Sequence, residues 1–425
     1  MRLLACGLLA VSSFAAAETV AIVGATVHTM TAPEPIRDAT ILVRDGRIEA
    51  VGTNVVIPAD ARRIEARGRV VTPAFLNSAT QLGLTEVGSV DATNDASVSS
   101  GSLGASFDIQ YAFNPRSLVI AQARADGLSR AITFPTGSAG APFAGMGALL
   151  QVLPDDAVLE RPRVAMFAEV GGQASGRVGG SRSAQWQLIR SALDEAKAFK
   201  PGSRNDPRDS ALNRADLAAL KQVAEGKVPL VIDANRESDI RQAIALARDY
   251  KLKVILKGAL EGWRAADELA AAKIPVILDP TINLPLYFDH VGVRADNATL
   301  LARAGVRVIL HASFSIYTTY NAGFALREVA GVAVANGLDH HTALAALTAN
   351  PAIVWGVDDR YGTIAPGREA DLLIWDGDPF EPLTTLVSVI LQGSEVSMQT
   401  RQGQLRDRYK PGTATSPVPP AYRSP

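Results

Sequence analysis

The sequence predicts an α/β fold, in which a (β/α)8 TIM barrel is joined to a smaller composite β-sandwich domain that both ends of the chain build. Residues 73–356 alternate short apolar runs with patterns typical of helices. The later runs are almost continuously apolar, as in parallel strands that are buried on both faces. β-rich segments lie before and after this region. Repeated strand–helix units of this size favour a closed barrel, and a doubly wound sheet is the competing architecture.

The composition is that of a globular protein without a strong charge bias. The chain is long enough for two domains, or for one barrel with an appendage, and it can bury a large core. Apolar residues make up 47% of its 425 residues, charged residues make up 20%, and the formal net charge is -1. We therefore expect no nucleic-acid partner, because the chain has no basic excess to bind phosphates, and no acidic surface for cationic partners.

The N-terminus has the three parts of a secretory signal peptide. Arg2 supplies the positive start, residues 3–10 form a short apolar centre, and three alanines at 15–17 form the exit. We expect residues 1–17 to be removed and the protein to be exported, to the periplasm in a bacterium. The residues around Cys6 also resemble a lipoprotein box, so anchoring through this cysteine is the alternative.

Cys6 is the only cysteine, so removal of the signal peptide leaves a chain without a thiol. Such a chain has no disulfide, thiolate metal ligand or thiol nucleophile. No other run is long and apolar enough for a membrane helix, and we expect no stable membrane insertion.

The two ends of the chain share the pattern of a β-domain. Asp45-Gly46 separates two β-rich runs and predicts a two-residue type I′ hairpin, since both positions tolerate positive φ. Similar short runs return after residue 370. The sequence therefore predicts a composite domain from residues 18–72 and 357–410. The Pro/Ser-rich tail, residues 411–425, is expected to be disordered.

The middle of the chain, residues 73–356, is predicted to form the barrel. Candidate strands after the first are residues 131–134, 147–153, 164–167, 229–233, 253–256, 274–278 and 306–310. Candidate helices are residues 184–199, 213–225, 237–250, 263–272, 295–304 and 341–348. The Ser/Gly-rich insertion at 91–107 is expected either to cover a site or to form a mobile surface loop.

Two stretches carry a likeness to a known family. Residues 70–84, VVTPAFLNSATQLGL, enter the barrel, and residues 361–372, YGTIAPGREADL, return to the terminal domain. Both resemble the amidohydrolase superfamily, and residues 274–278 and Asn350-Pro351-Ala352 resemble its imidazolonepropionase-like group of secreted proteins. The resemblance implies a barrel that hydrolyses amide, cyclic amide or dipeptide bonds with one or two metal ions at the C-terminal strand ends. Such a metal needs several converging nitrogen or oxygen ligands.

The family's metal ligands are carried over position by position, and most are replaced. The two histidines of the first strand correspond to Ala79 and Gln81, which are poor or incapable zinc ligands. The bridging acid corresponds to Glu169. The next two histidines correspond to Asp233 and Lys257, and an ammonium repels a metal cation.

The resemblance also places the family's last aspartate near residues 311–315, where no acid is found. Two candidate ligands, Glu169 and Asp233, therefore remain for one divalent metal such as zinc, or for none. The candidate catalytic residues are Glu169, Asp233 and Lys257, and the candidate substrate-binding residues are Gln81, Asn235, Arg236 and His311. The alternatives without a catalytic or binding role are that Glu169 is a surface acid, that His311 is a core residue, and that Asp233 and Lys257 pair across the barrel mouth.

Three functions stay open at this point. The first is a hydrolase of carbon–nitrogen bonds outside ordinary peptides, in which Glu169 or Asp233 activates water. The second is a pseudoenzyme that binds a small ligand in the barrel mouth. The third is a structural subunit that forms an oligomer with an active paralogue or with itself. A Gly-x-Ser-x-Gly elbow and a P-loop are both absent from the sequence.

Overall fold

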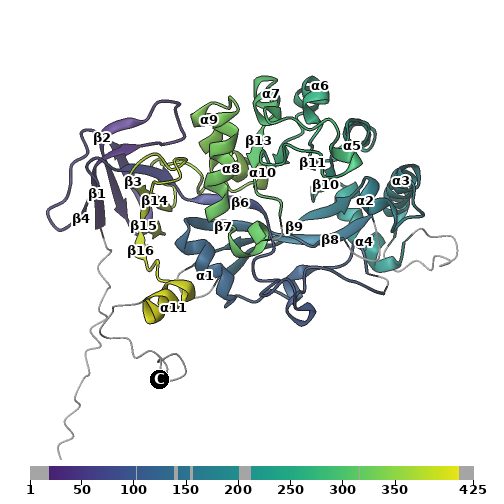
Figure 1. The fold of residues 1–425 in the computed structure, drawn as a ribbon, viewed down its shortest axis with the longest axis horizontal. Coiled ribbons are helices and arrows are strands. Elements are labelled where there is room, and N and C mark those ends of the chain that lie inside the picture. Colours follow the sequence, from purple (N-terminus) through teal and green to yellow (C-terminus); the bar gives the residue numbers. More distant parts are fainter. Residues whose placement is uncertain are drawn as a thin grey trace, which may run out of the picture.

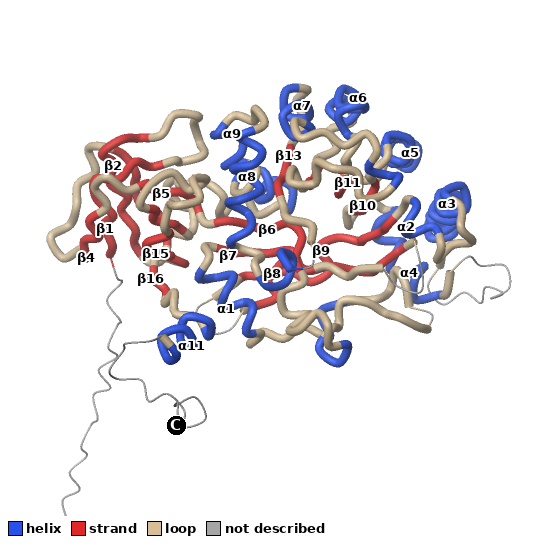
Figure 2. The backbone as a smooth tube through the Cα atoms, viewed as in Figure 1, coloured by secondary structure: helices blue, strands red, loops and turns tan. Residues whose placement is uncertain are grey.

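The computed structural model describes residues 19–101, 103–137, 142–153, 157–200, 212–314 and 316–410. The strands form two separate sheets, which Figures 1 and 2 show at one end and in the middle of the molecule. The predicted signal peptide, Cys6 and the tail at 411–425 lie outside the described residues. No helix of the described chain is long and apolar enough to cross a membrane.

The first sheet combines strands from both ends of the chain, in the order β16-β15-β14-β5-β1-β2-β3, and β4 pairs with β1. Its strands are β1 (Thr19–Val27), β2 (Ile36–Arg44), β3 (Arg47–Gly52), β4 (Arg62–Glu65), β5 (Val70–Pro73), β14 (Leu372–Trp375), β15 (Leu386–Leu391) and β16 (Ser394–Val396). Early and late strands lie side by side in Figure 1 because β5 pairs with β14. Asp45 and Gly46 both have positive φ and join β2 to β3, so the predicted hairpin is confirmed.

The second sheet is the barrel, in the order β13-β12-β11-β10-β9-β8-β7-β6. Its strands are β6 (Phe75–Thr80), β7 (Leu128–Thr133), β8 (Phe143–Gln151), β9 (Val158–Glu169), β10 (Leu230–Ala234), β11 (Val254–Gly258), β12 (Val276–Leu278) and β13 (Val308–Leu310). Cα atoms of β6 and β13, at the two ends of this order, come within 8 Å, so the sheet is nearly closed. The predicted TIM barrel with an added β-domain is confirmed.

One strand departs from the ideal (β/α)8 pattern. β8 runs antiparallel to both β7 and β9. Only residues 152–157 join β8 to β9, whereas a parallel connection needs a crossover of about a dozen residues or more. The interpretation of this region as regular strand–helix units is therefore wrong at β8, and β7 to β9 form an antiparallel meander within the barrel.

The helices lie around the barrel, except the last one, which lies near the first helix below the terminal sheet (Figure 1). They are α1 (Leu118–Ala125), α2 (Gly172–Ser175), α3 (Arg182–Ala198), α4 (Arg214–Ala224), α5 (Glu237–Tyr250), α6 (Ala266–Ala271), α7 (Asn297–Arg303), α8 (Phe324–Ala335), α9 (His340–Ala345), α10 (Ala349–Trp355) and α11 (Arg401–Tyr409). All six predicted helices are present. The described part of the 91–107 insertion is anchored to α4, since the main-chain nitrogens of Gly104 and Ser106 donate to Asp216 Oδ1 over 3.2 and 2.7 Å.

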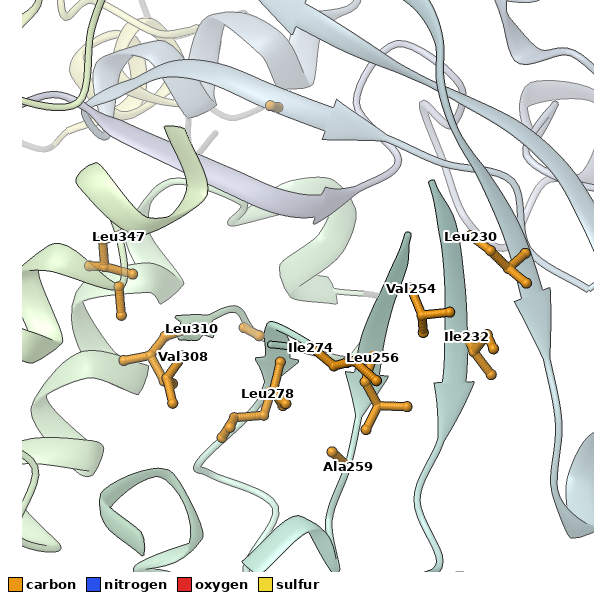
Figure 3. Packing of buried hydrophobic residues seen from close by; sticks show 14 of the residues in the cluster. Leu230, Ile232, Val254, Leu256, Ala259, Ile274, Leu278, Val308, Leu310 and Leu347 are labelled. Carbon is orange, nitrogen blue, oxygen red and sulfur yellow. The ribbon is translucent and has the colours of Figure 1, made fainter. Parts of the chain in front are cut away.

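Alternating residues on the barrel strands build two cores. Leu230 and Ile232 on β10 belong to the large cluster that packs against the helices, and Figure 3 shows them beside Val254 and Leu256 of β11. The intervening residue of β10, Val231, belongs to a smaller cluster inside the barrel. Because successive side chains of a strand point to opposite faces, both faces of these strands are apolar.

A buried arginine joins the barrel to the terminal sheet. Arg130 on β7 is fully buried and forms ion pairs with Glu160, Glu369 and Asp371 over 2.8, 2.5 and 2.7 Å. Its guanidinium also lies 4.2 Å from the centroid of the Tyr361 ring. Glu369 and Asp371 belong to the segment that re-enters the terminal sheet, so this cluster fixes that segment to the barrel.

A partly buried carboxyl group at the end of α1 should reduce the stability of the protein near neutral pH. Burial raises the pKa of Asp126 to about 6, although Gln122 and the main chain of Phe324 donate hydrogen bonds to it. Because this carboxyl binds its proton more tightly when folded, ionisation costs stability above pH 6, and the cost vanishes below about pH 4.

Asp126→Asn is therefore expected to raise the free energy of unfolding by about 1–2 kcal/mol at pH 7.5 and to change it little at pH 4. Urea denaturation at the two pH values measures this. Asp249→Asn is the matched control, because arginines lower the pKa of that exposed carboxyl and its loss should not stabilise. A gain of the same size at pH 4 would contradict the assignment.

Candidate active site

Three of the residues predicted for the site lie next to one another across neighbouring strands. In the register of the sheet, Asp233 on β10 is opposite Glu169 on β9 and opposite Lys257 on β11. All three stand at the C-terminal ends of parallel strands, which is the end of a barrel where active sites are found. The strand ends therefore bring two carboxylates and one ammonium together at the barrel mouth.

Lys257 and Asp233 form a close ion pair. Lys257 Nζ lies 2.6 Å from Asp233 Oδ2, and the two side chains are 15% and 29% exposed. Burial acts to lower the pKa of Lys257, but the carboxylates of Asp233, Glu169 and Asp279 outweigh it and raise the pKa above its usual value. The ammonium therefore keeps its charge at neutral pH. This pairing across the mouth is one of the alternatives that the sequence left open.

Glu169 is held by partners of its own. Its Oε2 accepts a hydrogen bond from Arg177 Nη1 over 2.7 Å, and its Oε1 accepts one from the main-chain nitrogen of Gly137 over 2.9 Å. The side chain is 27% exposed, so it is partly buried at the mouth. The loop that carries Arg177 thus neutralises one of the two candidate metal ligands.

Asp279 belongs to the site and was missed in the sequence. It follows β12 directly and is 2% exposed, and its Oδ2 accepts a hydrogen bond from the main-chain nitrogen of Ser313 over 2.7 Å. The negative charge of its carboxylate helps to raise the pKa of Lys257. The sequence does contain a signal for this residue, because Asp279 directly follows an apolar run, as Asp233 does.

His311 stands after β13 and is almost completely buried. Burial, together with the charge of Lys257, lowers the pKa of His311 to about 3, so the imidazole is neutral at physiological pH. Its Nε2 lies 3.3 Å from the hydroxyl of Ser313. His311 is therefore a neutral hydrogen-bonding group at the edge of the charged centre.

Three buried polar atoms of this region have no hydrogen-bond partner among the described residues. They are His311 Nδ1, Asn235 Oδ1 and His290 Nδ1. The last lies on the turn after β12, and Asp233 contributes to the electrostatic field at this ring. Buried polar groups are almost always paired in folded proteins. Unpaired atoms that follow three strands at the same end of the barrel therefore indicate a place for a bound polar group.

Glycine at position 258 leaves room for this arrangement. A Cβ atom there would lie 2.4 Å from Asn235 Oδ1 and 3.0 Å from Asp233 Oδ1. Gly258 also has a φ of 86°, which side-chain-bearing residues rarely adopt. Both the backbone conformation and the close approach of Asn235 therefore require glycine at the end of β11.

Ala79 and Gln81, the two positions at the end of the first barrel strand, differ in their surroundings. Ala79 is fully buried and packs in the cluster inside the barrel, with Ile132 and Val231 among its members. A small apolar side chain thus occupies this position in the interior of the barrel. Gln81 is half-buried in the loop after β6, where its main-chain nitrogen donates to Thr318 O over 3.0 Å.

Arg236 lies on the rim of the mouth. It is exposed and lines a pocket of about 650 Å³ together with Arg182, Tyr287, Phe288 and Asp289. Asp289 accepts hydrogen bonds from Arg182 and from the main-chain nitrogen of Gly172, so it clamps the loop after β12 to the loop after β9. The exposed Phe288 and Arg236 make this rim suited to a ligand with apolar and anionic parts, whereas Arg182 is paired with Asp239 and Asp289.

The residues of the mouth do not fit a metal ion. Among the described residues, no group of three or more His, Cys, Asp or Glu side chains is arranged to hold one. The oxygens of Asp233 and Glu169 face Lys257 and Arg177, and a charged ammonium 2.6 Å from Asp233 would repel a second cation. The pair that was expected to bind a metal is therefore engaged by side-chain cations.

Comparison with known sequences gives one family and two curated relatives. Residues 276–405 match the model of the amidohydrolase family. The "Amidohydrolase tasK" of Hapsidospora irregularis is 23% identical over 83% of this chain, and the adenine deaminase of Deinococcus deserti is 26% identical over 91% of it. The chain spans only 39% and 62% of the lengths of these two relatives.

Solved structures share the fold. An amidohydrolase from Thermotoga maritima superposes with a TM-score of 0.77 at 24% identity, covering 89% of this chain and all of the other. An adenosine deaminase from Xanthomonas campestris with bound zinc gives a TM-score of 0.52 at 18% identity, covering 90% and 94%. The predicted resemblance is thereby confirmed: the chain carries an amidohydrolase-family region at residues 276–405 within the fold of solved amidohydrolases.

Proposed function

We propose that this chain is an exported protein with an amidohydrolase fold that binds a small amide-bearing ligand at the barrel mouth. The observation that carries the proposal is the contact of 2.6 Å between Lys257 Nζ and Asp233 Oδ2. In the family to which the sequence is likened, the corresponding strand ends hold metal ligands. Here the positive charge at this place belongs to a side chain.

The free polar atoms suit an amide. An ammonium has three N–H donors, and Asp233 accepts from one of them, so Lys257 retains donors for a carbonyl oxygen. Asn235 Oδ1 has no donor among the described residues and is able to accept from an amide N–H. His311, being neutral, supplies one further donor or acceptor. A ligand with a carbonyl oxygen beside an N–H satisfies these groups together.

Binding is favoured over hydrolysis because every acid among the described residues of the mouth is held by an ion pair or by hydrogen bonds. A group that activates water must reach it and accept a proton. Asp233 is paired with Lys257, and Glu169 is paired with Arg177. Asp279 accepts hydrogen bonds from Thr281 and Ser313, and the charged Lys257 has no lone pair. His311, with a pKa of about 3, is a weak base.

Hydrolysis of a carbon–nitrogen bond is the second candidate, and the match to the amidohydrolase family favours it. In this case Asp233 or Glu169 activates water after its cationic partner moves away. Export is supported by the charged start, apolar centre and alanine exit of residues 1–17.

Ligand-induced stabilisation tests the proposal. Dipeptides, hydantoins and lactams are screened by thermal shift, and the best ligand is then titrated by calorimetry. His311→Leu removes the unpaired Nδ1 and keeps a similar volume, and it should weaken binding at least tenfold. His341→Leu is the matched control, because that ring also has an unpaired Nδ1 but lies in α9.

The two candidate functions give different results. Binding without turnover, lost in His311→Leu and kept in His341→Leu, supports the binding protein. Metal-dependent turnover of the same compounds, abolished by Asp233→Asn or Glu169→Gln, would replace it with the hydrolase.

A further inference from the structure

A second cavity lies at the opposite end of the barrel from Lys257 and Asp233. It has a volume of about 960 Å³ and is bounded by the N-terminal ends of β10, β11 and β12 together with parts of β9, α5, α6 and α10. We call it the basal groove. Each five-residue strand that separates it from the mouth spans roughly 13 Å, so the two sites are distinct.

The basal groove concentrates positive charge in a chain that is nearly neutral. Six of its described lining residues are basic, namely Arg161, Arg163, Lys227, Arg248, Lys253 and Lys273, and Glu268 is the one acidic residue among them. The whole chain has a formal net charge of -1. A cleft lined by one sign of charge raises the local concentration of ligands of the opposite sign.

Arg161, Lys253 and Lys273 lack a carboxylate partner among the described residues, whereas the other three cations have one. Arg163, Lys227 and Arg248 pair with Asp108, Glu225 and Asp249. Arg161 instead donates to the main-chain oxygen of Trp355, which leaves its charge uncompensated. Lys253 and Lys273 are exposed and form no ion pair with a described residue.

The floor between these cations is apolar. Val254 and Ile255 come from β11, Ile244 comes from α5, and Ile353 and Trp355 come from α10. Ile353 is 42% exposed, so part of this floor faces solvent. Covering such a surface with an apolar ligand removes it from water, which favours binding.

We propose that the basal groove binds a fatty-acid-like anion. The hydrocarbon chain lies on the floor formed by Ile244 and Ile353, and the carboxylate faces Lys253 and Lys273. The cavity volume falls within the range of about 300–1,000 Å³ that is usual for small-molecule sites. An apolar floor with a cationic rim complements a molecule that is itself apolar at one end and anionic at the other.

Calorimetric titration of the full mature protein with dodecanoate tests the proposal. The double variant Lys253→Glu/Lys273→Glu should bind at least tenfold more weakly, whereas Lys253→Arg/Lys273→Arg should keep the native affinity. Lys251→Glu is the matched control, because this exposed lysine lies two residues from Lys253 but outside the lining. It should change the affinity by less than about threefold, as expected for a screened charge at a distance.

Two further ligands test the contributions of the charge and of the hydrocarbon chain separately. Acetate carries the charge without the chain, and dodecyl maltoside carries the chain without the charge, and both should bind at least tenfold more weakly than dodecanoate. Ile353→Asp should weaken dodecanoate binding while the thermal melt stays cooperative. His311→Leu should leave dodecanoate binding unchanged, which keeps this test separate from that of the barrel mouth.

Three results would overturn the inference: no binding of dodecanoate to the native protein, equal binding to the Lys253→Glu/Lys273→Glu and Lys251→Glu variants, or equal affinity for acetate and dodecanoate. Tighter binding of a hexaglutamate peptide than of dodecanoate would replace the fatty acid with an acidic protein segment.

Discussion

Replacing Arg130 by methionine should lower the free energy of unfolding by about 3–5 kcal/mol, the cost typical of breaking a buried ion pair by removing one partner. This guanidinium is fully buried and contacts three carboxylates, of which Glu369 and Asp371 are also buried. Methionine fills most of the volume but leaves these acids without a cation. The expected result is a large drop in the urea midpoint of the protein.

The geometry also predicts that lysine cannot replace this arginine. Three nitrogens of Arg130 reach three different acids while the planar group stacks on Tyr361. A lysine has one charged nitrogen and no planar face, so Arg130→Lys should also destabilise. Arg44→Met is the matched control, since its pair with Glu49 is about half exposed and should contribute less than about 1 kcal/mol. Equal losses in the two methionine variants would show that the cluster does not hold the terminal sheet to the barrel.

The second large effect is expected at Lys257. In Lys257→His the cation beside Asp233 is replaced by a group that is neutral above its pKa and is a common zinc ligand. Asp233, Glu169 and Asp279 all act on the charge of Lys257 and so surround this position. The variant should therefore bind zinc at least tenfold more tightly than the native protein, and it should lose the amide ligand.

Competition with a chromophoric chelator measures zinc affinity directly. Lys253→His is the matched control, because it lies at the other end of the same strand, next to the basal groove. It should leave zinc affinity at the native level. Zinc binding that is as tight in the native protein as in Lys257→His would show that the ammonium does not exclude a metal.

Local signals in the sequence account for much of the fold. The hairpin at Asp45-Gly46 follows from the need for two positive φ values, and both residues have them. The apolar runs that become β10 and β11 end in Asp233 and Lys257, so their convergence follows from parallel pairing alone. The sequence of α8 does not clearly predict a helix, since Gly331 and several valines lower its helix propensity.

Features that depend on contacts between distant parts of the chain could not be predicted from local sequence patterns. The antiparallel course of β8 is set by the short connection to β9, whose strand extends back to Val158 instead of starting near residue 164. The acids that pair with Arg130 are 30 to 241 residues away along the chain. Arg177, which neutralises Glu169, lies in a glycine-rich loop that shows no periodicity. Residues of this kind are placed by tertiary packing, which the local sequence does not encode.

The metal content of the native protein tests the central claim most directly. Protein purified without chelators is analysed by inductively coupled plasma mass spectrometry, beside Asp233→Asn as a reference. Since the ammonium of Lys257 lies 2.6 Å from Asp233 and repels a second cation, we expect less than about a tenth of an equivalent of zinc, manganese or iron per chain. About one equivalent of metal in the native protein, lost in Asp233→Asn, would contradict the proposal that Lys257 excludes a metal.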